Sequence, residues 1–151
     1  MQIKNLLWPS DLSEQANAAL PYVQDLADKY GAKVHLLYVA QDLESADHWY
    51  GDADRRMLES LQERECDFAS HFLDDVCKDR LHGCPAFERH IRKGDPAKEI
   101  VAFARGHNID AIVMSTHGKG QKQGDSGHFG SVADRVVKNA SVPVFVVQPK
   151  N

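Results

Sequence analysis

Short apolar segments alternate with amphipathic segments along the chain, and this order constrains the fold more than any other feature. Five segments have the character of strands, four of them largely apolar and one alternating: 3–8, 33–40, 87–94, 110–115 and 142–148. Between them, apolar residues recur at helical spacing over residues 14–30, 54–80, 96–105 and 131–140. The order predicts an α/β fold, in which an open parallel five-stranded sheet carries helices on both faces.

Proline and capping residues predict where some helices begin or bend. Pro21 lies inside the first helical pattern and predicts a kink, because an interior proline removes a backbone hydrogen bond and clashes with the preceding turn. Asp95 followed by Pro96 predicts an N-cap and the first helical position. Ser131 and Asp134 match the S-x-x-D capping box, which predicts that the last helix begins there.

Length and charge limit the class of protein. A chain of 151 residues suits one domain, 1–151, and its net charge of -4 disfavours nucleic acid as a partner. No apolar segment approaches the ~20 residues of a membrane span or the pattern of a signal peptide, so we expect no membrane insertion and a cytoplasmic location. Three cysteines without an export signal indicate free thiols, and Cys77, His82 and Cys84 lack the paired spacing of a zinc site.

A glycine-rich stretch, residues 115–134, follows the apolar run of residues 111–114. Glycines cluster where the backbone curls tightly or where a ligand approaches it closely, so the stretch is either a phosphate-binding loop or a flexible surface loop. It lacks the Gly-Lys-Ser/Thr of a P-loop, and its GxGxxxG spacing is one residue too long for a dinucleotide fingerprint. The start of the helix at Ser131 offers free N–H groups and a positive dipole end to an anion.

In the predicted sheet, a second loop lies opposite the glycine-rich stretch. In open α/β sheets, ligands bind beyond the carboxyl ends of the strands, where the strand order reverses. If the order is 3-2-1-4-5, the loop after the first strand, residues 9–14, faces the glycine-rich stretch across that point. This arrangement favours ligand binding over a flexible loop.

Several separated blocks of the sequence together resemble the universal stress protein family, in the right order and over essentially the full chain. These blocks are "LLWPSDLSE", "KVHLLYVA", "KGDPAKEIVAFARGHNIDAIVMSTHGKG" and "GSVADRVVKNASVPVFVV". The resemblance implies strand order 3-2-1-4-5 in the adenine nucleotide alpha hydrolase-like fold. It also implies a homodimer that pairs through the last strand, here Val144, Phe145, Val146 and Val147.

The resemblance further implies an ATP site, with ADP or AMP as alternatives and Mg²⁺ able to screen the phosphates. The family pattern is glycine, two residues, glycine, nine residues, glycine and serine or threonine. Here Ser115 takes the first glycine position, and eleven residues, 119–129, separate the next two glycines. The positions carried over as nucleotide contacts are Pro9, Ser10, Asp11, Val39, Ser115, His117, Gly118, Lys119, Gly130, Ser131 and Val132, with Asp11 near adenine and ribose and the backbone of Val39 at adenine.

Local positive charge is needed for such a ligand, because the chain is net negative. Lys119, Lys122 and His117, together with Arg135, lie in or beside the glycine-rich stretch. For Lys122, a solvated loop residue is as good an interpretation as a phosphate contact.

Three function classes remain open. The first is an adenine-nucleotide-binding regulatory protein of the stress response, and the second is a nucleotide-free dimer of the same fold that contacts an unknown client protein. The third is an enzyme of a related fold, which the absence of a Ser-Gly-Gly-x-Asp-Ser loop and of a His-x-Gly-His run disfavours. His117 is the one obvious candidate base, so slow ATP hydrolysis is conceivable without a dedicated catalytic site.

Overall fold

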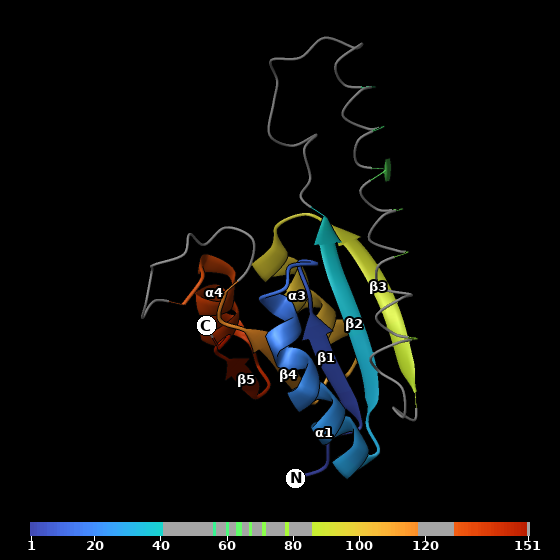
Figure 1. Ribbon diagram of the computed structural model, residues 1–151, viewed down its shortest axis with the longest axis vertical. Coiled ribbons are helices and arrows are strands. Elements are labelled where there is room, and N and C mark those ends of the chain that lie inside the picture. The colour runs from blue at the N-terminus through green and yellow to red at the C-terminus, as the bar shows by residue number, and fades with distance from the viewer. Residues whose placement is uncertain are drawn as a thin grey trace.

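The computed structural model of the chain forms a parallel sheet with helices on both faces (Figure 1). It describes residues 1–40, 86–117 and 129–150, together with seven exposed helical positions between them, Arg56, Ser60, Glu63, Arg64, Asp67, His71 and Lys78. The strands are β1 (Asn5–Pro9), β2 (Lys33–Ala40), β3 (Phe87–Lys93), β4 (Ala111–Ser115) and β5 (Val144–Val147). The helices are the 3-10 segment η1 (Ala16–Ala19), α1 (Leu20–Tyr30), α3 (Pro96–Gly106) and α4 (Ser131–Asn139).

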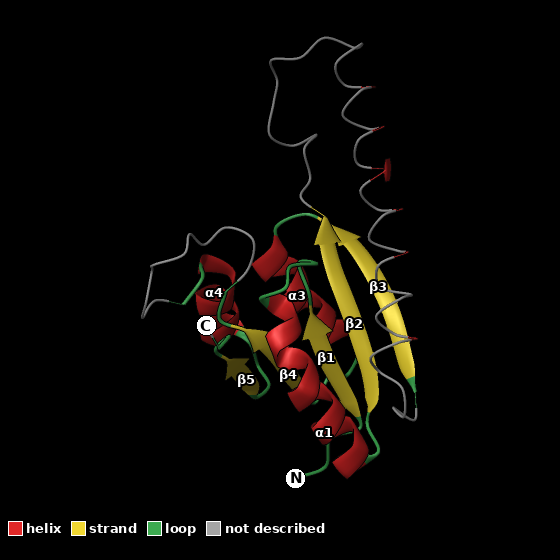
Figure 2. Ribbon diagram, in the orientation of Figure 1, coloured by secondary structure: helices red, strands yellow, loops and turns green. Residues whose placement is uncertain are grey.

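The sheet has the strand order β3-β2-β1-β4-β5, and its strand pairs are parallel, as predicted. The carboxyl ends of β1, β2 and β3 all point toward the top of Figure 2, and the N-terminus of the chain lies at the bottom. β1 therefore lies between β2 on one side and β4 on the other, and the strand order reverses between β1 and β4.

Two apolar clusters lie on opposite faces of the sheet. One joins α1 to the sheet through residues such as Leu6, Trp8 and Val23, and the other joins α3 and α4 to it through residues such as Leu7 and Phe103. Figure 1 shows α1 in front of the sheet and α3 behind it. Alternate residues of β1 and β2 thus enter opposite layers, which explains why these strands are apolar almost throughout.

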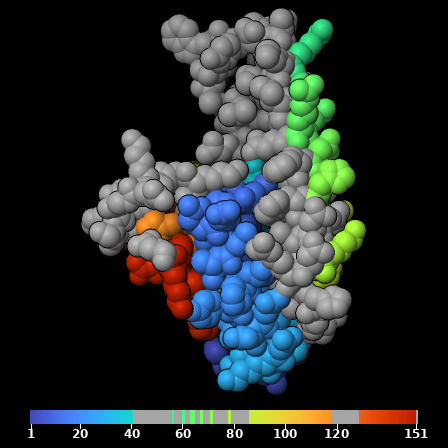
Figure 3. All heavy atoms as spheres, viewed as in Figure 1, coloured from blue at the N-terminus to red at the C-terminus, as the bar shows by residue number. Residues whose placement is uncertain are grey.

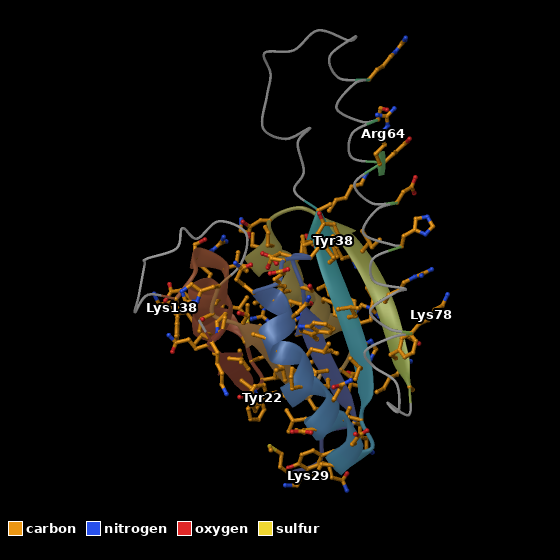
Figure 4. All side chains as sticks on the ribbon, in the orientation of Figure 1. Tyr22, Lys29, Tyr38, Arg64, Lys78 and Lys138 are labelled. Carbon is orange, nitrogen blue, oxygen red and sulfur yellow. The ribbon has the colours of Figure 1, made fainter. Side chains whose placement is uncertain are left out.

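Side chains outside these layers point into solvent. Figure 4 shows Tyr22 and Lys29 projecting outward from α1 and Lys138 from α4, whereas Tyr38, near the carboxyl end of β2, is buried. No helix among the described residues is long and apolar enough to cross a bilayer.

The first helical region differs from the prediction of one kinked helix. The chain forms the 3-10 segment η1 and then begins α1 at Leu20, so that Pro21 lies in the first turn. A proline there costs nothing, because the first N–H groups of a helix have no intrahelical partner. Gly31 ends α1 in the left-handed conformation, with φ of 63°.

The helix predicted over residues 54–80 falls mostly outside the described residues. The described positions in that range are helical and exposed, which agrees with a helix whose charged positions face solvent. Cys66, Cys77, His82 and Cys84 also lie outside the described residues.

Candidate functional site at the carboxyl ends of β1 and β4

The strands β1 and β4 part before they reach their carboxyl ends. β1 pairs with β2 from Asn5 to Pro9, whereas its register with β4 covers Leu6 and Leu7. If that register continued, Ser10 would be level with Ser115 on the neighbouring strand. These strand ends lie where the strand order reverses, and open α/β sheets bind ligands in the crevice beyond such strand ends.

The loop after β1 is held by its own side chains. The Ser10 N–H still donates to the Leu37 carbonyl at 2.9 Å, which continues the pairing with β2. The Ser10 hydroxyl oxygen accepts from the Leu12 N–H at 3.2 Å, and Asp11 Oδ1 accepts from both the N–H and the hydroxyl of Ser13. Leu12 has a φ of 67°, a left-handed conformation that is uncommon for leucine and that these bonds maintain.

The end of β4 carries the second set of predicted residues. Ser115 is the last strand residue and is buried, and its hydroxyl oxygen accepts from the His117 N–H at 3.3 Å. Thr116 continues the ladder, because its N–H donates to the Val147 carbonyl at 2.9 Å. The Thr116 hydroxyl also lies within hydrogen-bond distance of His117 Nδ1, so that the imidazole is fixed at the strand end.

Gly130 ties the start of α4 to the end of β4. Its N–H donates to the Thr116 carbonyl at 2.7 Å, and a Cβ added at Gly130 would lie 2.9 Å from the same oxygen. The first-turn residues Ser131 and Val132 therefore begin beside the carboxyl end of β4. The N–H groups of a first helical turn lack intrahelical acceptors and attract anions.

The predicted capping box at Ser131 and Asp134 is wrong. Gly130 is the N-cap of α4 and carries no side chain to cap it, while Ser131 is already the first helical residue. The Asp134 carboxylate pairs instead with Lys138 one turn later, at 2.7 Å. The helix start is set by the contact of Gly130 with Thr116 rather than by a local cap.

Arg135 forms an ion pair with the N-cap residue of α3. Its guanidinium donates two hydrogen bonds to the Asp95 carboxylate, at 2.9 and 2.8 Å. Asp95 also caps α3, as predicted, by accepting from the Lys98 N–H at 3.0 Å. The Arg135 guanidinium and this N–H hold the pKa of Asp95 below its usual value. The ion pair thus fixes α4 against the beginning of α3 and makes Arg135 a structural residue.

The predicted site residues fall into three groups. One strand end carries Pro9, Ser10 and Asp11, the next carries Ser115 and His117, and the helix start carries Gly130, Ser131 and Val132. Figure 3 shows blue atoms of the N-terminal part close to orange and red atoms of the C-terminal part on one face. Val39 lies half-buried in β2, packed against the α3 face of the core. Gly118, Lys119 and Lys122 are outside the described residues.

Thr116 is the residue at this site that the sequence did not reveal. Its contribution is through backbone atoms, which bond both Val147 and Gly130. Those bonds depend on tertiary placement, and no side-chain pattern signals them.

Known proteins resemble this chain over nearly its whole length. The model of the universal stress protein family matches residues 2–148. The universal stress protein MJ0531 of Methanocaldococcus jannaschii is 31% identical over 145 residues, covering 96% of this chain and 82% of that protein.

Two solved structures have the same fold over nearly the whole chain. Protein MJ0577, from the same organism, superposes with a TM-score of 0.86 at 28% identity, covering 100% of this chain and 99% of that one. UspA from Lactobacillus plantarum superposes with a TM-score of 0.84 at 26% identity, covering 97% and 99%. With its strand order and its match to the family model, the chain belongs to the universal stress protein family.

Proposed function

We propose that the protein binds an adenine nucleotide, ATP or its products ADP and AMP, in the crevice between β1 and β4. It acts as a cytoplasmic regulatory protein of the stress response, formed by one domain over residues 1–151 and working as a homodimer. Nucleotide occupancy would alter its contacts with a client protein. The site binds the nucleotide and hydrolyses ATP slowly at most.

The separation of β1 from β4 beyond Leu7, together with the fixed start of α4, carries the proposal. A ligand needs space between the strand ends, and its phosphates need backbone N–H donors that are already oriented. The Gly130 contact with Thr116 holds the first turn of α4 against the carboxyl end of β4. This arrangement is suited to a phosphate group.

The residues of the β1 loop fit the sugar end of such a ligand. Asp11 Oδ1 accepts from Ser13 in this loop, and a carboxylate is a group to which ribose hydroxyls can donate. The family resemblance implies that the backbone of Val39 contacts the adenine. Universal stress proteins of this fold have been solved in complex with cAMP and with dAMP, at 18% and 22% identity to this chain. At that identity the likeness shows the fold alone, so the proposal rests on the residues described above.

The test is isothermal titration calorimetry with Mg-ATP, ADP, AMP and GTP. We expect adenine nucleotides to bind with micromolar affinity, about 8 kcal/mol of binding free energy, and GTP to bind more weakly. Gly118→Val, placed on the family pattern, should abolish binding through a clash with the phosphates. Gly106→Ala, in a helix away from the crevice, is the matched control and should bind normally.

A protein that is folded by circular dichroism and binds no adenine nucleotide at millimolar concentration would contradict the proposal. The same preparation should be denatured and its small molecules identified by mass spectrometry, since a nucleotide bound during expression would block the titration. Absence of both bound and exchangeable nucleotide would favour the nucleotide-free interaction module instead.

The homodimer is proposed to pair through β5. β5 is an edge strand of the sheet, and the Phe145 side chain on it is 37% exposed. The nearby helix α4 adds Val137, another exposed apolar residue. An edge strand with exposed apolar side chains is a surface that a second chain can extend.

A further inference from the structure

Three polar side chains cluster on the α3 face of the sheet, between β2 and β3. His35 lies directly opposite Glu88 in the parallel register, and His90 follows two residues later on the same face of β3. One ligand atom from each of the three lies within 4.8 Å of the others. None of the three is among the residues of the proposed nucleotide site.

The distances within this cluster approach those of a coordinated metal ion. His35 Nδ1 and His90 Nε2 are 3.1 Å apart. Glu88 Oε2 lies 3.6 Å from His90 Nε2 and 3.9 Å from His35 Nδ1. Ligands at the usual zinc distance of ~2.0–2.1 Å in tetrahedral geometry are about 3.3–3.4 Å apart. Shifts of a few tenths of an ångström would therefore close the site around an ion.

Neighbouring residues fix the orientation of two of the three donors, those of His35 and Glu88. Asn5 Nδ2 donates to the Asn108 carbonyl at 3.3 Å, so its Oδ1 faces His35 Nε2 at 3.2 Å and accepts the imidazole proton. Nδ1 of His35 then carries the lone pair, and in the metal-free chain it accepts from the Nε2–H of His90 at 3.1 Å. A metal ion would replace that proton, and His90 would take its Nδ1-protonated tautomer. Lys33 pairs with Oε1 of Glu88 and leaves Oε2 facing the two histidines. Such outer contacts, which fix the tautomer and the orientation of a ligand, are typical of metal sites.

The cluster is buried on the side of the histidines and open on the side of Glu88. The side chain of His35 is 6% exposed, that of His90 19% and that of Glu88 49%. The rings of Phe103 and His107 pack against the histidines from α3. A fourth ligand, such as water, can approach from the side of Glu88.

We propose that His35 Nδ1, His90 Nε2 and Glu88 Oε2 form a binding site for a divalent first-row transition metal ion, with Zn²⁺ as the ion that best fits the ligand set. Two imidazoles and one carboxylate are ligands that zinc accepts readily. The ion would join β2 to the edge strand β3 through side chains that are 55 residues apart in sequence. It would therefore stabilise that edge of the sheet.

The test is titration of the full chain, freed of metal with a chelator, with Zn²⁺ and with Co²⁺. We expect one Zn²⁺ per chain at this site, and a shift of the imidazole ¹⁵N resonances of His35 Nδ1 and His90 Nε2 on binding. Co²⁺ bound there should give visible absorption bands without the near-ultraviolet charge transfer of thiolate ligands. This readout separates the site from the cysteines.

His90→Ala and Glu88→Gln should each weaken Zn²⁺ binding at this site by about 100-fold or more, since even outer contacts are worth about 10–100-fold. His71→Ala removes an exposed histidine elsewhere and should leave the affinity unchanged. Unchanged affinity in both cluster variants, unmoved resonances of His35 and His90, or binding through thiolates alone would overturn the proposal. Circular dichroism confirms that each variant is folded.

Discussion

Gly130 is the residue on which the geometry of the crevice depends most directly. Its φ of −56° is available to any residue, so conformational freedom is not why glycine is needed there. The need is steric, because the Thr116 carbonyl oxygen occupies the space that a side chain would take. A single close approach of two backbone segments therefore sets the distance between the end of β4 and the start of α4.

Gly130→Ala should destabilise the protein and weaken nucleotide binding together. The new Cβ would lie 2.9 Å from the Thr116 oxygen, so the helix start must shift, at a cost of about 1–3 kcal/mol. Urea unfolding measures the first effect and calorimetry the second. Gly106→Ala is the matched control, because a Cβ there meets nothing within 4 Å and should stabilise α3 by up to about 1 kcal/mol. Equal stabilities of the two variants would refute the steric argument.

At the scale of elements, α3 and α4 are joined through one carboxylate. Asp95 caps α3 and receives the Arg135 guanidinium from α4. Two variants separate these contributions. Asp95→Ala removes the cap and the ion pair, whereas Asp95→Asn keeps a good N-cap and removes the charge. We expect a loss of about 1–2 kcal/mol for Asp95→Ala in urea unfolding and a smaller loss for Asp95→Asn. The reverse order would contradict the capping role.

The same pair predicts a pH dependence. The pKa of Asp95 is lowered in the folded chain, so the folded state favours the ionised carboxylate. Its contribution to the free energy of unfolding is fully present above the unfolded pKa of about 3.9 and is lost as the pH falls through the folded value. The stability difference between the parent chain and Asp95→Asn should shrink below about pH 4. If the stability difference between the two proteins stays the same from pH 2 to pH 7, the ionised Asp95 carboxylate does not stabilise the folded state.

Elements with strong local signals were predictable from the sequence, and those set by tertiary contacts were not. The alternation of strands and helices and the Asp95 cap are confirmed, because apolar runs and capping residues are local signals. The strand order, which the family resemblance implied, is confirmed as well. The kink at Pro21 and the capping box at Ser131 are wrong, since both depend on where the helix begins. The His35 and His90 pair was missed, because only the register of β2 with β3 brings these rings together.

At the scale of the whole molecule, the two edges of the sheet have different characters. The β3 edge is mostly polar, with Glu88, Arg89 and Lys93 exposed beside one exposed apolar residue, Phe87, and the proposed metal site lies beside it. The β5 edge is short and apolar. Charged residues on an edge strand oppose pairing with another chain, while an apolar edge permits it. The sheet therefore favours association through β5 over association through β3.

The outward backbone groups of β5 give the sharpest test of that association. The carbonyls of Pro143 and Val147 bond to β4, and because a parallel ladder alternates, the Val146 N–H faces the free edge. Val146→Pro removes this donor without removing a bond to β4. If the proposed dimer pairs through β5, this variant should be monomeric in size-exclusion chromatography with light scattering. Val146→Ala keeps the N–H and should remain dimeric. If the proline variant is folded and still dimeric, β5 does not pair through its backbone, and the interface must lie elsewhere.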